Sequence, residues 1–184
     1  NFSSAWQSSG LTSFPADIDL SKGTNFENAW RSTPLTEFNT PLPNATSLKY
    51  TFLQCGQLTS LGVQEFPELI NIQQTFQSCA NLTSFSTSLP KIKYLPYAFW
   101  NCTSLTDFSY SVFENWNPET ISNGIFDQAW DNCTSLTAQS VGNILQSIDA
   151  SGQHGTDDGT STGNPLGNSG IDIDYNGDTL SAAT

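Results

Sequence analysis

The sequence predicts an α/β solenoid, in which the chain stacks about six short rungs on one another. Three observations lead to this class: a Leu-Thr pair recurs, an aromatic residue precedes each pair, and a small residue stands between them. The recurring leucines are spaced by 24, 23, 24, 23 and 31 residues. They are Leu11, Leu35, Leu58, Leu82, Leu105 and Leu136. Such self-similarity is typical of repeat proteins, whose units bury their apolar sides only against their neighbours.

Two further columns keep the same phase. The aromatic stands 5 or 6 residues before each leucine, and the third residue after it is Ser, Thr or Cys. The aromatics are Trp6, Trp30, Phe52, Phe76, Phe99 and Trp130. The small residues are Ser9, Thr33, Cys55, Cys79, Cys102 and Cys133. We expect both columns to form a buried structural ladder.

The period of 23–24 residues lies within the range of leucine-rich repeats. A short parallel strand is expected in each rung around Phe14, Phe38, Leu61, Phe85 and Phe108. The block that ends at the aromatic, such as 72–76, is expected to form a helical or 3₁₀ turn on the opposite side. A proline often closes the strand, and proline suits a strand end because it has no amide to donate.

The strings YAFWNCTSLTDF (97–108) and QTFQSCANLTSF (74–85) resemble the core of BspA-like, treponemal-type leucine-rich repeats. The resemblance covers about residues 1–137 and recurs six times. It implies a non-enzymatic protein of a bacterial cell surface, a protist or a virus, with a role in adhesion to host or neighbouring-cell molecules.

The four cysteines have three interpretations. They occupy one position of successive repeats, which favours a buried column of free thiols over disulfides between rungs. A zinc site is the third alternative, but it typically uses C-x₂₋₄-C pairs, and the sequence has none.

Five N-x-S/T sequons have two interpretations: an asparagine turn before the strand, which the repeat itself generates, or N-glycosylation. The asparagines are Asn1, Asn44, Asn81, Asn101 and Asn132.

Beyond the repeats (1–137), residues 138–149 have apolar side chains at helical spacing, at Val141, Ile144, Leu145 and Ile148. We expect a helix that caps the last rung, with a partner-binding helix as the alternative. Residues 150–170 are rich in Gly, Ser and Asp and predict a loop or linker. His154 in this loop is expected to be solvated rather than a catalytic base.

Residues 171–184 predict a strand, a turn at Asn176-Gly177 and the start of a further element, so the chain is expected to be a fragment. The alternative is a calcium loop, because its early positions carry oxygen ligands although Ala183 replaces the usual terminal Glu. The candidate Ca²⁺ ligands are Asp172, Asp174, Asn176 and Asp178. No other cofactor is expected.

Charge, hydropathy and motif content argue against three classes of function. The 184 residues carry a net charge of −12, and all of the basic residues precede residue 94. Nucleic-acid binding is therefore not expected, since phosphate binding needs clustered Lys and Arg. No apolar run approaches the ~20 residues of a membrane span, so membrane insertion is not expected either. No catalytic motif is present, and we expect no enzyme.

The leading hypothesis is a recognition or adhesion module of a cell surface or virion, such as an adhesin or a phage tail fibre. Such a module is extracellular and binds a host or neighbouring-cell protein or glycan through the strand face. The alternative is a structural or self-assembling surface or filament subunit, which would be a homo-oligomer. Polar residues beside the expected strand centres are the candidate ligand-binding set: Glu37, Asn39, Ser60, Ser84, Ser86, Asp107 and Ser109.

Overall fold

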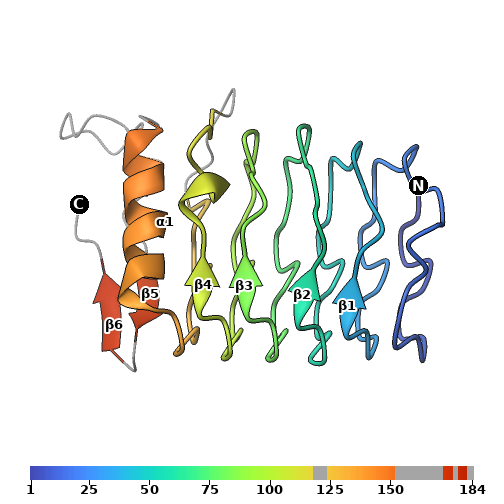
Figure 1. Cartoon of the computed structure of the whole chain (residues 1–184), viewed down its shortest axis with the longest axis horizontal. Coiled ribbons are helices and arrows are strands. Elements are labelled where there is room, and N and C mark those ends of the chain that lie inside the picture. The colour runs from blue at the N-terminus through green and yellow to red at the C-terminus, as the bar shows by residue number, and fades with distance from the viewer. Residues whose placement is uncertain (118–123, 152–171, 176–177, 182–184) are drawn as a thin grey trace.

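The computed structural model describes residues 1–117, 124–151, 172–175 and 178–181. Short parallel strands lie in the first part of the chain, a 3₁₀ helix and an α-helix follow, and a hairpin comes last among these residues (Figure 1). Strand β1 pairs with β2, β3 pairs with β4, and β5 pairs antiparallel with β6. The elements are β1 Glu37–Phe38, β2 Ser60–Leu61, β3 Ser84–Phe85, β4 Asp107–Phe108, the 3₁₀ helix η1 Tyr110–Val112, α1 Ala138–Ala150, β5 Asp172–Tyr175 and β6 Asp178–Ser181.

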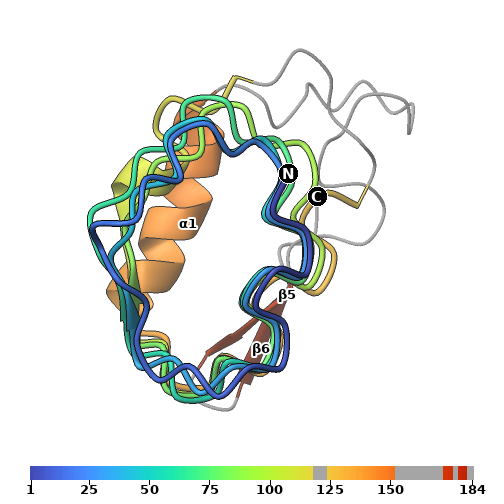
Figure 2. The same ribbon diagram turned by 90° about the vertical axis from the view of Figure 1, so that its right-hand side faces the viewer.

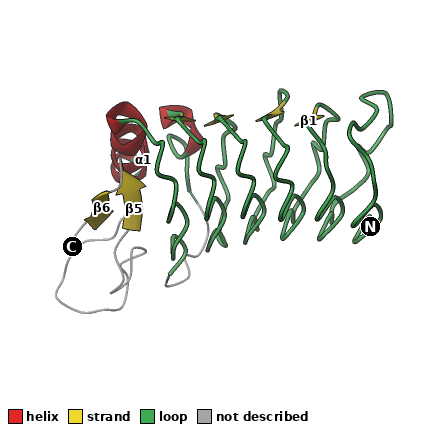
Figure 3. Cartoon of the chain, turned by 90° about the horizontal axis from the view of Figure 1, so that it is seen from below, coloured by secondary structure: helices red, strands yellow, loops and turns green. Residues whose placement is uncertain are grey.

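The predicted α/β leucine-rich-repeat solenoid, with a helical turn and a strand in each rung, is wrong. The structure is 11% helical and 9% strand, and no solenoid of such rungs is seen. The parallel strands form two separate two-stranded sheets instead of one continuous sheet. Loops and turns make up most of the chain (Figure 3).

The backbone around each aromatic residue explains why no helical turn forms there. The residues two before and two after the aromatic have positive φ, between 48° and 63°. A right-handed helix does not admit such residues, so the chain turns repeatedly instead of coiling into a helix. They are Ser4, Ser8, Asn28, Ser32, Tyr50, Gln54, Gln74, Ser78, Tyr97, Asn101, Gln128 and Asn132.

We use "segment" for the stretch of chain around each ladder aromatic together with the strand or turn that follows it. Backbone amides in a segment alternate between two kinds of partner. The Ala29 amide closes a turn onto the Phe26 carbonyl at 2.9 Å, whereas the next amide, of Trp30, donates to the Thr51 carbonyl of the following segment at 3.0 Å. The amides directed within a segment and those directed toward the following segment therefore both have an acceptor, as buried backbone groups require.

The Leu-Thr pair has a direct structural explanation. The amide and the hydroxyl of Thr59 both donate to the Thr36 carbonyl, each at 2.9 Å. Thr83 and Thr106 bond in the same way to the threonine one segment earlier. Threonine at this position therefore forms two hydrogen bonds to the neighbouring segment. Viewed along the row, the segments follow nearly the same outline (Figure 2).

Aromatic rings form two rows within the core. The ladder aromatics stack face to face from Trp6 to Trp130, with ring centroids 4.9–6.4 Å apart. In the second row Phe14 stacks on Phe38 at 5.7 Å and Phe85 on Phe108 at 5.6 Å. Leu61, which is half-buried, interrupts this second row at the place where the two parallel sheets are separate.

The cysteines lie beside the ladder. All four are buried and form no disulfide. Each thiol donates to the carbonyl of the aromatic one segment earlier, as Cys102 Sγ does to Phe76 O at 3.0 Å. Burial raises the pKa of Cys55 and raises the pKa values of Cys79 and Cys102 well above the usual range.

Helix α1 begins after Thr137, whose hydroxyl accepts the Ser140 amide as an N-cap. The predicted range was 138–149, and the helix ends at Ala150. Its buried side chains include Val141, Ile144 and Ile148. The helix packs against β4 and η1 at one end of the row of segments. No helix in the described part of the chain has the length and apolar character needed to cross a membrane.

Candidate functional site

The predicted ligand-binding residues fall into two groups. In the first group Glu37 of β1 is in register with Ser60 of β2, and Asn39 directly follows β1. In the second group Ser84 of β3 is in register with Asp107 of β4, and Ser86 and Ser109 directly follow these strands. The two groups therefore lie on two separate two-stranded sheets.

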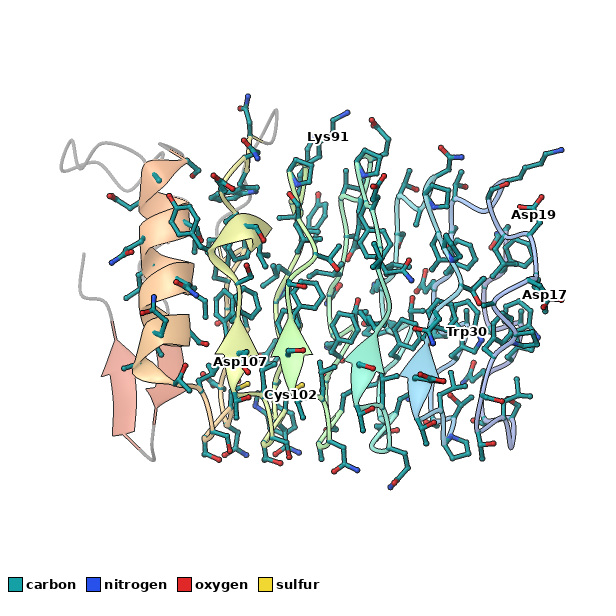
Figure 4. The ribbon with its side chains drawn as sticks, in the orientation of Figure 1. Asp17, Asp19, Trp30, Lys91, Cys102 and Asp107 are labelled. Atoms are coloured by element: carbon teal, nitrogen blue, oxygen red, sulfur yellow. The ribbon has the colours of Figure 1, made fainter. Side chains whose placement is uncertain are left out.

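A groove unites the second group. It lies between the β3–β4 pair and the start of helix α1, and its volume is about 160 Å³. Figure 4 shows Asp107 on β4, between β3 and the helix. The lining residues are Ser84, Phe85, Ser86, Asp107, Phe108, Ser109, Gln139, Ser140 and Asn143.

Helix α1 contributes Gln139, Ser140 and Asn143, which sequence reasoning did not include in the site. The apolar spacing of 138–149 was visible in the sequence. Nothing in that pattern specifies which strand the polar face of the helix meets, because that depends on how the helix packs.

The apolar part of the groove comes from Phe85 and Phe108. These side chains are 3% and 1% exposed, and they stack with ring centroids 5.6 Å apart. Since the rings belong to the core, they hold the two strands, and the polar residues that alternate with them, in fixed positions.

Several polar groups in the groove already serve the structure. Ser140 Oγ accepts the Phe108 amide and donates to the Thr106 carbonyl, both at 2.9 Å. Asn143 Nδ2 donates to the Phe108 carbonyl at 2.8 Å. These bonds satisfy the outer edge of β4, which would otherwise have unpaired backbone groups. Ser109 Oγ is also engaged, because it accepts the Ser111 amide at the start of η1.

Other polar groups in the groove remain available. The hydroxyls of Ser84 and Ser86 have no hydrogen-bond partner among the described residues. The Asp107 carboxylate is exposed and accepts one hydrogen bond, from Thr106 Oγ1 at 3.0 Å. Two hydroxyls and a carboxylate oxygen therefore face the solvent on a rigid support.

The charge of the groove selects against some ligands. Asp107 is its one ionisable lining residue, and no Lys, Arg or His lines it. A phosphate or carboxylate ligand would meet a negative charge without a compensating base. The groove suits a neutral ligand that exchanges hydrogen bonds with hydroxyl and carboxylate groups.

The candidate calcium ligands lie elsewhere. Asp172 and Asp174 belong to β5, and Asp178 belongs to β6, whereas Asn176 lies outside the described residues. Tyr175 pairs with Asp178 across the hairpin. Elsewhere in the described chain no group of three or more His, Cys, Asp or Glu side chains is placed to hold a metal ion. Calcium binding stays a prediction, as does the assignment of His154, which also lies outside the described residues.

Two sequon asparagines occupy left-handed backbone positions. Asn101 and Asn132 have φ values of 62° and 63°, and Asn132 Nδ2 donates to Asn101 Oδ1 at 3.0 Å. Asparagine tolerates this conformation better than most residues, which supports the turn interpretation at these positions.

Comparison with known proteins adds nothing to this geometry: no protein-family model matches the chain, and neither a curated protein nor a solved structure is significantly similar to it. The resemblance to BspA-like repeats stays a prediction.

Proposed function

We propose that the protein is a non-enzymatic recognition module of a cell surface or virion, and that it binds a neutral, hydroxyl-rich ligand such as a glycan in the groove between β3–β4 and α1. The observation that carries the proposal is the pair of unengaged hydroxyls, Ser84 and Ser86, beside the Asp107 carboxylate.

The geometry favours binding over chemistry. None of the residues that line the groove has a basic nitrogen. None of their hydroxyls is paired with a general base of the kind that activates a nucleophile. The rigid aromatic support of the groove restricts the movement of Ser84 and Asp107, which lowers the entropy lost when a ligand orders them.

A panel of immobilised neutral glycans, followed by calorimetric titration of the best ligand, tests the proposal. We expect saturable binding that weakens roughly tenfold in the S84A/S86A double variant, because two hydrogen bonds of about 0.5–1.5 kcal/mol are lost. D107N should weaken binding of the same ligand, since a charged acceptor forms the stronger hydrogen bond.

Ser60→Ala is the matched control. Ser60 occupies the equivalent strand position in β2 but lies outside the groove. Equal affinities of S84A/S86A and S60A would contradict the proposed site, and a panel without any saturable ligand would contradict the proposed glycan class.

A further inference from the structure

Helix α1 contributes a side chain to the groove whose hydrogen-bonding atoms are assigned by the backbone of β4. The Phe108 carbonyl can only accept, and it accepts Asn143 Nδ2 at 2.8 Å. Asn143 therefore has its Oδ1 atom left as an acceptor, and Gln139 Nε2 donates to it at 2.9 Å. The Oε1 atom of Gln139 has no partner among the described residues, so Gln139 adds a free acceptor to the lining of the groove.

The hydroxyl of Ser109 also keeps only acceptor capacity. Ser111 Oγ donates its proton to the Ser86 carbonyl at 3.2 Å. The 2.9 Å contact between the hydroxyls of Ser109 and Ser111 therefore uses the proton of Ser109. A hydroxyl has one proton and two lone pairs, and one lone pair of Ser109 accepts the Ser111 amide. One lone pair remains for a ligand.

The Asp107 carboxylate receives less than one full hydrogen bond from its neighbours. Thr106 Oγ1 lies 3.0 Å from Asp107 Oδ2 and 3.1 Å from the Thr83 carbonyl, and its single proton is shared between the two acceptors. An ionised carboxylate has about four sites that accept hydrogen bonds. Asp107 therefore keeps most of its acceptor capacity for a ligand.

Free donors are fewer than free acceptors in the groove. The Ser140 hydroxyl is saturated, because it accepts two hydrogen bonds and donates one. The remaining protons belong to the hydroxyls of Ser84 and Ser86 and to the second amide hydrogen of Gln139. Both serine hydroxyls can accept as well as donate, whereas Asp107 only accepts. The groove is therefore complementary to a ligand that brings more donors than acceptors.

We propose that the groove recognises two neighbouring free hydroxyl groups of one sugar ring, which donate to Asp107 and to Gln139 Oε1, and that Gln139 is a specificity-determining residue. This inference rests on the proposed glycan-binding function. A methylated, acylated or fluorinated position of the sugar has no proton to donate, and it would leave the carboxylate or the amide oxygen without a partner. The groove therefore discriminates between glycans by their hydrogen-bond donors.

The test titrates the full chain with the methyl glycosides of glucose, galactose and mannose, and then with each monodeoxyfluoro analogue of the glycoside that binds. Fluorine replaces a hydroxyl group at similar size and donates no proton. Removing the hydroxyl that donates to Asp107 should weaken binding about tenfold or more, because a hydrogen bond to a charged group is lost. Removing the hydroxyl that donates to Gln139 should weaken binding about two- to tenfold.

Gln139→Ala identifies the hydroxyl that Gln139 contacts. Q139A should weaken binding of the unmodified glycoside about two- to tenfold. It should not weaken binding of the analogue that lacks the contacting hydroxyl, because that hydrogen bond is already absent. Gln146→Ala is the matched control, since Gln146 is exposed on the same helix but does not line the groove. Both variants should keep the circular dichroism spectrum of the unmodified chain.

The outcomes separate this inference from the proposed function. Equal affinities for all monodeoxyfluoro analogues, with binding that still depends on Ser84 and Ser86, would overturn the inference and leave the glycan site in place. Equal affinities of Q139A and Q146A for the unmodified glycoside would overturn the role of Gln139. Binding of longer glycans without binding of any methyl glycoside would mean that two hydroxyls of one ring do not suffice, which also overturns the inference. Absence of every saturable glycan would overturn the proposed function and the inference together.

Discussion

The two ends of the row of segments differ in how far their ladder aromatics are buried and in whether their backbone groups are paired. The last ladder aromatic, Trp130, is 0% exposed, whereas the first, Trp6, is half-buried although it belongs to the same column. At the helix end, Ser140 and Asn143 satisfy the edge of β4. At the other end, no amide of the described residues donates to the carbonyls of Asn1, Ser3, Ala5 and Gln7.

This difference shows that a segment depends on its neighbours for both burial and hydrogen bonds. Pro15 gives the first segment one backbone amide fewer than the later segments have at the same position. In later segments, Gly62 and Ser109 donate their amides to the strand one segment earlier. The first segment has Pro15 at this position, which has no amide and so leaves no donor unpaired.

The largest effect should come from truncating the two terminal aromatics. Trp130→Ala should cost about 3–5 kcal/mol of unfolding free energy, because a fully buried ring leaves a cavity. Trp6→Ala should cost roughly half as much, since this side chain is only half-buried. Urea denaturation followed by circular dichroism measures both, and equal losses would mean that the two ends are not distinct.

The edge hydrogen bonds at the helix end should have the next largest effect. Ser140→Ala leaves the buried Phe108 amide without its acceptor, which should cost about 1–3 kcal/mol. Hydrogen exchange of that amide should accelerate correspondingly. Gln139→Ala, one residue earlier on an exposed position, should change stability by less than about 0.5 kcal/mol; a similar loss in both variants would contradict the edge-satisfying role of Ser140.

The thiols of the small-residue column should make the free energy of unfolding depend on pH, whereas the hydroxyls near the other end should not. The column carries hydroxyls at Ser9 and Thr33 and thiols from Cys55 onward. Burial raises the pKa of Cys102 in the folded state, so its proton stays bound after unfolded thiols, with an ordinary pKa near 9, release theirs. The stability due to this thiol is complete below pH 9 and falls above it, by up to about 1.4 kcal/mol per pH unit.

Cys102→Ser should reduce this alkaline slope, because a hydroxyl donates to Phe76 O without titrating. Urea midpoints at several pH values from neutral to alkaline, measured on both proteins, give the difference. An unchanged slope in C102S would mean that the alkaline loss has another origin.

Part of this arrangement was predictable from the sequence. The spacing identified aromatics that stack on their equivalents and threonines that bond to theirs, because these contacts join like positions. It also identified the cysteines, whose thiols bond to the aromatic carbonyl one segment earlier. Strands do lie at Phe38, Leu61, Phe85 and Phe108. Ser84, Ser86, Asp107 and Ser109, which line the groove, were also among the predicted binding residues.

The fold class was wrong because spacing specifies neighbours but not backbone dihedrals. Left-handed turns are usually signalled by glycine, yet here they fall on residues such as Ser4, Tyr50 and Gln74. Without a glycine signal, the block before each aromatic was interpreted as a helical turn. The helix side of the groove was not predictable for a different reason: it arises where α1 packs on β4, a contact between residues 32–35 positions apart.

The smallest effect should come from surface charge. Lys91 Nζ lies 2.7 and 2.8 Å from the two Glu68 carboxylate oxygens one segment earlier, and both side chains are about half exposed. Lys91→Ala should cost no more than about 0.2–1 kcal/mol, and high salt should reduce this difference further, because exposed ion pairs are screened. A loss as large as that of W130A would mean that side-chain charges, rather than ring stacks and backbone bonds, hold neighbouring segments together, and the contrast between the two ends would then need another cause.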